Sequence, residues 1–222
     1  MDIIQIKLKS YMTRIFKLKL DTQRTGDPEY DAVQINLKEF NNVPFYFLDP
    51  NTYSIDRIPK LLYYDANFEY IPKYDFPFTD SGIFTVSKKV KEVLYQFVEF
   101  KFYEVPVVML DNTFLEKRFD DEGTLNQSIT VNLDYVALRF PELKSYFDFD
   151  KSIYRIPSYN PNGVRGIKKM VLKEPKNGFP IIFRTKESAS TVFVSEELKN
   201  ELENVNVKGC VFEEVEVSPY II

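Results

Sequence analysis

An apolar run that ends in a serine and continues into a helical pattern occurs twice in this chain. The first copy runs from residue 82 to 97 and the second from residue 190 to 205. After each serine, apolar residues recur at offsets of three, seven and ten, which places them on one face of a helix. Ser87 and Ser195 are therefore predicted to be N-caps, whose hydroxyl groups accept a hydrogen bond from a first-turn amide.

Each of these units continues into an apolar, strand-like stretch, at residues 100–110 and 210–217. The first twenty residues alternate between apolar and polar side chains, which is the period of a strand. We therefore predict an α+β fold, with a mixed or antiparallel sheet and two short Ser-capped helices packed on it. The two serines lie 108 positions apart, and the units are either an internal duplication or a local solution that arose twice.

A long stretch rich in aromatic residues and proline precedes the first helix. Residues 40–80 hold 12 of the 35 aromatic residues and 5 of the 13 prolines. Each proline removes a backbone donor and favours an extended residue before it, so this stretch is predicted to be irregular. Its rings either pin the segment to the core or form a contact surface for a partner, with Tyr63 and Tyr64 as the candidate anchors.

The composition fits one globular domain, which we expect to span residues 1–222. The chain is 44% hydrophobic and 28% charged, with both signs of charge intermixed. Such a chain can bury a sizeable core and keep a solvated surface. If the chain is bilobal, the boundary is expected near residues 110–128.

Charge and cysteine content limit the compartment and the partners. The net charge of −4 argues against nucleic acid as a partner, although residues 165–176 carry five basic residues against Glu174 alone. Cys210 is the only cysteine, the N-terminal residues lack the features of a signal peptide, and no run of 18 apolar residues occurs. We therefore expect a cytoplasmic protein with no membrane association.

The chain contains no histidine. Histidine is the side chain that titrates near neutral pH and the commonest metal ligand, so its absence excludes Ser-His-Asp and Cys-His catalysis and His-bearing zinc sites. We expect no enzymatic activity, no cofactor and no metal. Catalysis by carboxylates alone remains an alternative, with Asp120, Asp121, Asp148 and Asp150 as its candidates.

Two acidic segments could face a cationic partner. One is the triplet Asp120, Asp121 and Glu122, and the other includes Glu213 and Glu214 in a region, residues 196–216, with seven carboxylates against two lysines. An acidic surface steers the encounter with a basic partner. The alternative interpretation is an ordinary solvated turn, helix face and strand.

Three short segments near the C-terminal end resemble, in their order, a known family. They are an apolar strand that ends in Phe-Arg at residues 179–184, a strand leading to Ser-Glu-Glu-Leu-Lys at 192–199, and a Gly-Cys-Val-Phe-Glu strand at 209–213. The chain resembles a bacterial immunity protein family, the eleventh of those paired with polymorphic toxins and formerly a domain of unknown function. The resemblance covers the last forty residues and, more loosely, residues 80–110.

This resemblance implies a cytoplasmic inhibitor that blocks one cognate toxin by direct contact, without a cofactor. We therefore expect toxin neutralisation, with Tyr63, Tyr64 and the acidic residues at 120–122 and 213–214 in contact with a basic face of the toxin. Two alternatives remain. A cleft that holds two carboxylates would favour a small hydrolase, and a large, apolar, self-complementary patch would favour a structural or assembly protein.

Overall fold

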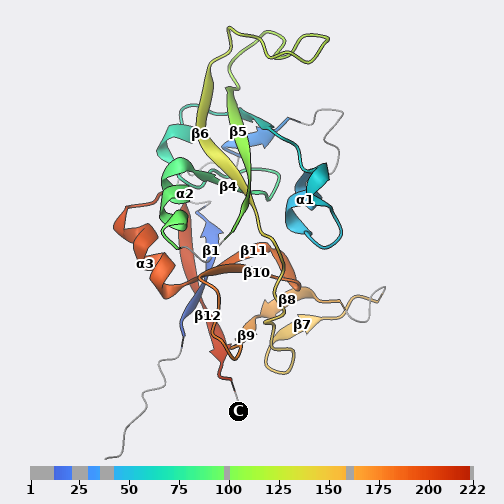
Figure 1. Ribbon diagram of the computed structural model, residues 1–222, viewed down its shortest axis with the longest axis vertical. Helices are drawn as coiled ribbons and strands as arrows, with labels where there is room; N and C mark the ends of the chain where they lie inside the picture. The colour runs from blue at the N-terminus through green and yellow to red at the C-terminus, as the bar shows by residue number, and fades with distance from the viewer. Residues whose placement is uncertain (1–12, 22–29, 36–42, 98–100, 159–162, 221–222) are drawn as a thin grey trace, which may run out of the picture.

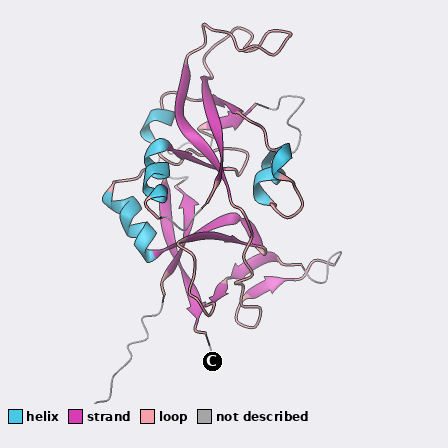
Figure 2. Ribbon diagram, viewed as in Figure 1, coloured by secondary structure: helices cyan, strands magenta, loops and turns pink. Residues whose placement is uncertain are grey.

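The computed structural model describes residues 13–21, 30–35, 43–97, 101–158 and 163–220. Strands dominate this part of the chain and form two five-stranded sheets, one above the other along the long axis, with the main helices along one side (Figures 1 and 2). The fold is therefore α+β as predicted, but mostly β. Among the described residues, no helix has the length and hydropathy needed to cross a membrane.

The lower sheet in Figure 1, here called the C-terminal sheet, combines one strand from the start of the chain with four from its end. Strands β12 and β9 are parallel, and the other neighbours are antiparallel. The order across the sheet is β10 (Ile182–Thr185), β11 (Ser188–Ser195), β1 (Ile15–Leu20), β12 (Cys210–Ser218) and β9 (Val171–Lys173).

Residues 144–148 connect the two edges of the C-terminal sheet. The Lys144 backbone nitrogen donates to the Arg184 carbonyl on β10 at 2.8 Å, and the Asp148 nitrogen donates to the Val171 carbonyl on β9 at 2.9 Å. Both edge strands thus have backbone partners outside the sheet, and the sheet curls into a half-barrel. Edges covered in this way are protected from pairing with another chain.

The upper sheet, here called the N-terminal sheet, contains the aromatic-rich segment. It has one parallel pair, β3 and β5, and its other neighbours are antiparallel. The order across the sheet is β2 (Ala32–Gln34), β3 (Leu62–Ala66), β5 (Tyr103–Asp111), β6 (Val131–Arg139) and β4 (Phe84–Ser87). Between β2 and β4 the chain also forms α1 (Val43–Leu48) and the 3₁₀ turns η2 (Ile55–Arg57) and η3 (Ile71–Lys73).

The two sheets share one arrangement of four strands. In the N-terminal sheet the order is β4, β6, β5, β3, and in the C-terminal sheet it is β11, β1, β12, β9, with the same parallel and antiparallel relations. The central strand follows the other three in the chain in the first case, as β6, and precedes them in the second, as β1. The repeat therefore extends from the helical unit to four strands, in a permuted chain order, which favours an internal duplication.

Helices α2 (Lys88–Tyr95) and α3 (Glu196–Asn204) occupy equivalent places in the two repeats. Ser87 lies at the N-cap of α2, where its Oγ accepts from the Val90 amide at 3.3 Å, and Ser195 lies at the N-cap of α3, where its Oγ accepts from the Leu198 amide at 3.2 Å. Buried residues of both helices join a single hydrophobic cluster with residues of both sheets, so the helices cover the junction between the sheets. The helical residues of this cluster are Val90, Val93, Leu94, Leu198 and Leu202.

The chain passes from one sheet to the other twice, first between β1 and β2 and again between β6 and β9. The segment 110–128, where a boundary was expected, instead covers the end of β5 and most of its connection to β6, two paired strands of the N-terminal sheet. A two-stranded ribbon of β7 (Ile153–Arg155) and β8 (Arg165–Lys169) lies in the connection between β6 and β9. That residues 1–222 form one domain stays a prediction.

Candidate protein-binding surfaces

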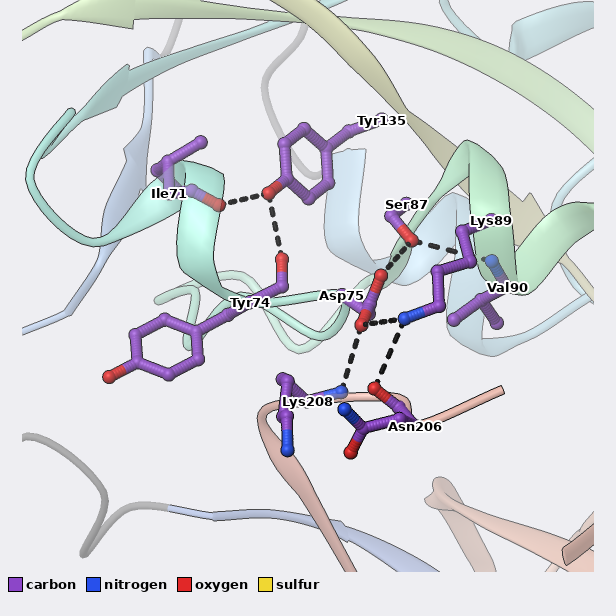
Figure 3. Close-up of polar contacts among 9 residues, drawn as sticks. All are labelled: Ile71, Tyr74, Asp75, Ser87, Lys89, Val90, Tyr135, Asn206 and Lys208. Atoms are coloured by element: carbon purple, nitrogen blue, oxygen red, sulfur yellow. Dashed lines mark hydrogen bonds and ion pairs between the residues drawn. The ribbon is translucent and has the colours of Figure 1, made fainter. Parts of the chain in front are cut away.

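A polar junction centred on Asp75 joins the two repeats (Figure 3). Its Oδ1 accepts from the Ser87 hydroxyl at 2.7 Å, and its Oδ2 accepts from the Lys208 backbone nitrogen at 2.8 Å and from Lys89 Nζ at 3.2 Å. Lys89 Nζ also donates to the Asn206 carbonyl at 3.1 Å. One carboxylate thus connects the start of α2 to the loop between α3 and β12.

The backbone reinforces this junction. The nitrogens of Asp75 and Phe76 donate to the Lys208 carbonyl at 2.9 and 3.1 Å. The Tyr135 hydroxyl, reaching from β6, donates to the carbonyls of Ile71 and Tyr74. Asp75 and Asp134 both line a cavity of about 410 Å³ at this junction. Both oxygens of the Asp75 carboxylate accept hydrogen bonds, and the exposed Asp134 pairs with Lys88 at 3.6 Å, so the arrangement connects the two sheets.

The four carboxylates proposed for a hydrolase do not form one site. Asp120 Oδ1 accepts from the backbone nitrogens of Glu122 and Thr124 at 3.0 and 2.7 Å, which stabilises a turn between β5 and β6. Asp148 is buried beside the C-terminal sheet, where its Oδ2 accepts from the Ser218 hydroxyl at 2.6 Å. No group of three potential metal ligands occurs among the described residues.

Hydrogen bonds to the Asp148 carboxylate stabilise its charged form. The hydrogen bond from Ser218, together with those from the amides of Lys151 and Asp150, holds the pKa of the Asp148 carboxyl below its usual value. The charged carboxylate is thus the form that the surrounding donors stabilise. Asp148 anchors the segment that connects the edges of the C-terminal sheet to the end of β12.

The connection between β5 and β6, residues 112–130, is here called the arm. Its acidic triplet at residues 120–122 is exposed, and Leu115 is 98% exposed. The arm folds against β3: the Phe119 ring meets the Tyr63 ring edge-on at 5.0 Å, and Arg118 pairs with Asp65. The structure therefore places Tyr63 beside the segment of the arm that carries the acidic triplet, and the arm lies at the upper end of Figure 1.

The prediction that Tyr64 contacts a partner is wrong, because Tyr64 does not reach this surface. Its side chain is fully buried, and its hydroxyl lies 3.0 Å from Ser81 Oγ. Burial raises the pKa of Tyr64 to about 12. Successive side chains of a strand point to opposite faces, so Tyr63 faces the arm while Tyr64 faces the core.

Glu213 and Glu214 lie in the other sheet and are paired with cations of β1 and the residues before it. Glu213 pairs with Lys17 at 3.0 Å and with Lys19, and Glu214 pairs with Arg14 at 2.7 Å. The hydrogen bonds from Lys19 and Lys17 lower the pKa of Glu213. These two glutamates thus belong to a mixed-charge face and not to the acidic surface of the arm.

Sequence reasoning missed a buried cation. The Arg184 side chain is 2% exposed, and its guanidinium carbon lies 4.9 Å from the centre of the Phe140 ring. Burial lowers the pKa of Arg184 to about 9, and no carboxylate within the described ranges pairs with it. The pattern of an apolar strand ending in Phe-Arg pointed to the position, but not to the burial of its charge.

Part of the chain matches a known protein family. The model of an immunity protein family (Imm11) matches residues 144–217. This is about a third of the chain, and it contains α3 and every strand of the C-terminal sheet except β1. The resemblance seen at residues 179–213 lies inside this segment and is confirmed, whereas residues 80–110 lie outside it. No curated protein matches the chain.

Proposed function

We propose that this chain is an immunity protein that binds a cognate bacterial toxin and neutralises it by direct contact. The family match over residues 144–217 is the observation that carries this proposal. The matched segment is a complete structural layer apart from one strand, since β9 to β12 and α3 all belong to it. The N-terminal sheet repeats the same four-strand arrangement, which supports extending the proposal beyond the matched segment.

Neutralisation by contact suits the surface chemistry of the arm. Glu116, Asp120, Asp121 and Glu122 outnumber Lys117 and Arg118, and Lys117 is paired with Asp121. Such a surface accelerates encounter with a basic face, while an exposed apolar side chain supplies an anchor once contact is made.

Leu115 and Tyr63 have the properties expected of anchors on this surface. Leu115 is almost fully exposed, and Tyr63 is partly exposed and held by the Phe119 ring. The contact with Phe119 restrains Tyr63, and a restrained side chain loses less entropy on binding. We therefore propose that the arm and Tyr63 enter or cover the active site of a toxin with a basic face, and that the complex forms in the cytoplasm without a cofactor.

The experiment is a protection assay. The reading frame next to this gene is expressed from an inducible promoter in a bacterial host, with and without this chain on a second plasmid. We expect growth to stop without the chain and to continue with it. A neighbouring product that stops growth equally in both cases would contradict the proposal, and so would a neighbouring product with no effect on growth.

A further inference from the structure

The ribbon formed by β7 and β8 carries a concentration of positive charge that the proposed function does not use. Residues 149–158 and 163–169, here called the basic ribbon, contain Lys151, Arg155, Arg165, Lys168 and Lys169 against Asp150 alone. All five cations are exposed. The ribbon is therefore a positively charged region in a chain with a net charge of −4.

Most of this charge has no internal partner. Lys169 pairs with Glu216 at 2.7 Å. Within the part of the chain that the structure describes, no carboxylate forms an ion pair with the other four cations. Unpaired cations that are gathered on one small element repel one another, and an external anionic group would relieve this repulsion.

The register of the ribbon concentrates the repulsion on two arginines. Arg155 of β7 lies directly opposite Arg165 of β8, and like charges at opposite positions destabilise a pair of strands. The neighbouring Gly166 has a φ of +57°, and a Cβ at that position would meet the Arg155 side chain at 3.7 Å. The register thus places the two arginines opposite each other, and within the described residues no carboxylate forms an ion pair with either.

Apolar side chains stand exposed among these cations. Phe149, Ile153 and Ile156 are 49%, 55% and 61% exposed. Tyr154, between them, packs edge-on against the buried Phe147 ring at 5.4 Å, so the ribbon is anchored to the C-terminal sheet through its other face. Its outer surface combines cations with large apolar groups.

We propose that the basic ribbon binds an anionic lipid surface peripherally. Lysine and arginine side chains bind acidic headgroups, while aliphatic and aromatic side chains enter the boundary between headgroups and acyl chains. Recognition of single-stranded nucleic acid would need exposed aromatic rings for stacking, and two of the three exposed apolar side chains are isoleucines. The cations and the large apolar side chains of the ribbon are exposed, so its projecting surface fits a broad partner better than a small ligand.

The position of the ribbon allows this contact despite the net negative charge of the chain. The ribbon lies at the lower end of the molecule, and the acidic arm lies at the upper end (Figure 1). Charges separated by more than a Debye length, about 8 Å at physiological salt, are largely screened. The expectation of no membrane association rested on the absence of a spanning segment, and a peripheral contact needs no such segment.

The test is cosedimentation of the full chain with lipid vesicles. Vesicles of phosphatidylcholine alone are compared with vesicles that contain about one third phosphatidylglycerol, at low and at high salt. We expect binding only to the anionic vesicles, weakened by salt. The double variant Arg155→Glu, Arg165→Glu should lower the partition coefficient at least about tenfold, and Ile153→Ser with Ile156→Ser should lower it without changing the net charge.

A matched control separates local from total charge. The double variant Arg57→Glu, Lys60→Glu makes the same change in net charge at two exposed residues near η2, and it should bind vesicles like the unchanged chain. Circular dichroism checks folding, and Arg155→Gln with Arg165→Gln replaces the reversal if that variant unfolds. Absence of binding to anionic vesicles at low salt would overturn the proposal. An equal decrease of the partition coefficient in the control variant would also overturn it. So would binding to duplex DNA or to polyglutamate without binding to anionic vesicles.

Discussion

The Oδ2 atom of Asp75 lies 2.8 Å from the backbone nitrogen of Lys208, across 133 positions of the chain. Asp75 precedes the first helical unit, and Lys208 follows the second. The same carboxylate accepts from Ser87, which caps α2. A single side chain therefore links the capping of one helix to the loop that leaves the other, and it ties the two repeats together.

The two capping serines should differ in their effect on stability. Ser195→Ala removes one cap and is expected to lower the free energy of unfolding by about 1 kcal/mol. Ser87→Ala removes a cap and also the hydrogen bond to the Asp75 carboxylate, so a loss of about 2 kcal/mol or more is expected. Urea unfolding at neutral pH measures both. Equal losses for the two variants would show that the bond to Asp75 contributes nothing.

The capping pattern could be predicted because it is local. A serine followed by apolar residues at helical spacing fixes where a helix begins, and α2 and α3 begin directly after Ser87 and Ser195. The place of β1 between β11 and β12 could not be predicted, because its partners lie far along the chain. The pairing of Glu213 with Lys17 depends on that placement, so a segment that is acidic in sequence forms a mixed-charge face in space.

The burial of the two tyrosines at the candidate site was also not predicted from the sequence. The alternation of a strand predicts that Tyr63 and Tyr64 face opposite sides, but two identical neighbours do not reveal which one is buried. Tyr64 is the buried one because its face of β3 packs into the core of the N-terminal sheet, whereas Tyr63 contacts Phe119 of the arm. The burial of Arg184 could not be predicted either, since its guanidinium lies against Phe84 of β4 and against Phe140, which follows β6.

Asp148→Asn should lower stability only where the carboxylate is charged. The folded-state pKa of Asp148 lies below its ordinary value because Ser218 and two amides donate to it. Its contribution is therefore present above the unfolded-state pKa of about 4 and is lost as the pH falls through the folded-state pKa. We expect a loss of about 1–2 kcal/mol at pH 7, shrinking in acid. Denaturant titrations across acidic and neutral pH measure it.

Asp150→Asn is the matched control, because Asp150 is exposed and lies two positions away. It should leave the free energy of unfolding nearly unchanged at every pH. If the loss caused by Asp148→Asn were the same at pH 7 and in acid, the charge of Asp148 would have no part in its role.

Arg184→Met is expected to keep or increase stability. A buried guanidinium without a carboxylate partner pays a desolvation penalty, and an apolar side chain of similar length can fill the same space between Phe84 and Phe140. Arg184→Ala should instead lower the free energy of unfolding by about 2 kcal/mol or more, because it leaves a cavity. Unfolding in urea compares the two. A Met variant as unstable as the Ala variant would show that the charge itself stabilises the fold.

The arm is expected to control the kinetics of toxin binding. Asp121→Lys with Glu122→Lys should slow association and reduce its salt dependence, and Asp120 is kept because it stabilises the turn. Tyr63→Ala should mainly speed dissociation, by about tenfold or more, since it removes an anchor and the contact with Phe119. Surface plasmon resonance at two salt concentrations separates these effects.

Glu69→Lys with Glu92→Lys serves as the control for total charge, because both residues are exposed and neither lies in the arm. If this control slowed association as much as the change in the arm, net charge rather than the arm would steer the encounter. Unchanged kinetics in every arm variant would place the toxin contact on another surface.

The central claim is that this chain forms a direct complex with a toxin, and the dissociation constant of that complex tests it most directly. The product of the neighbouring reading frame, inactivated by a substitution at its active site, is titrated with the purified chain in a calorimeter. We expect a one-to-one complex with a Kd of about 10⁻⁹ M or below, since a small free fraction of toxin can still kill. No complex at micromolar concentrations would contradict the account.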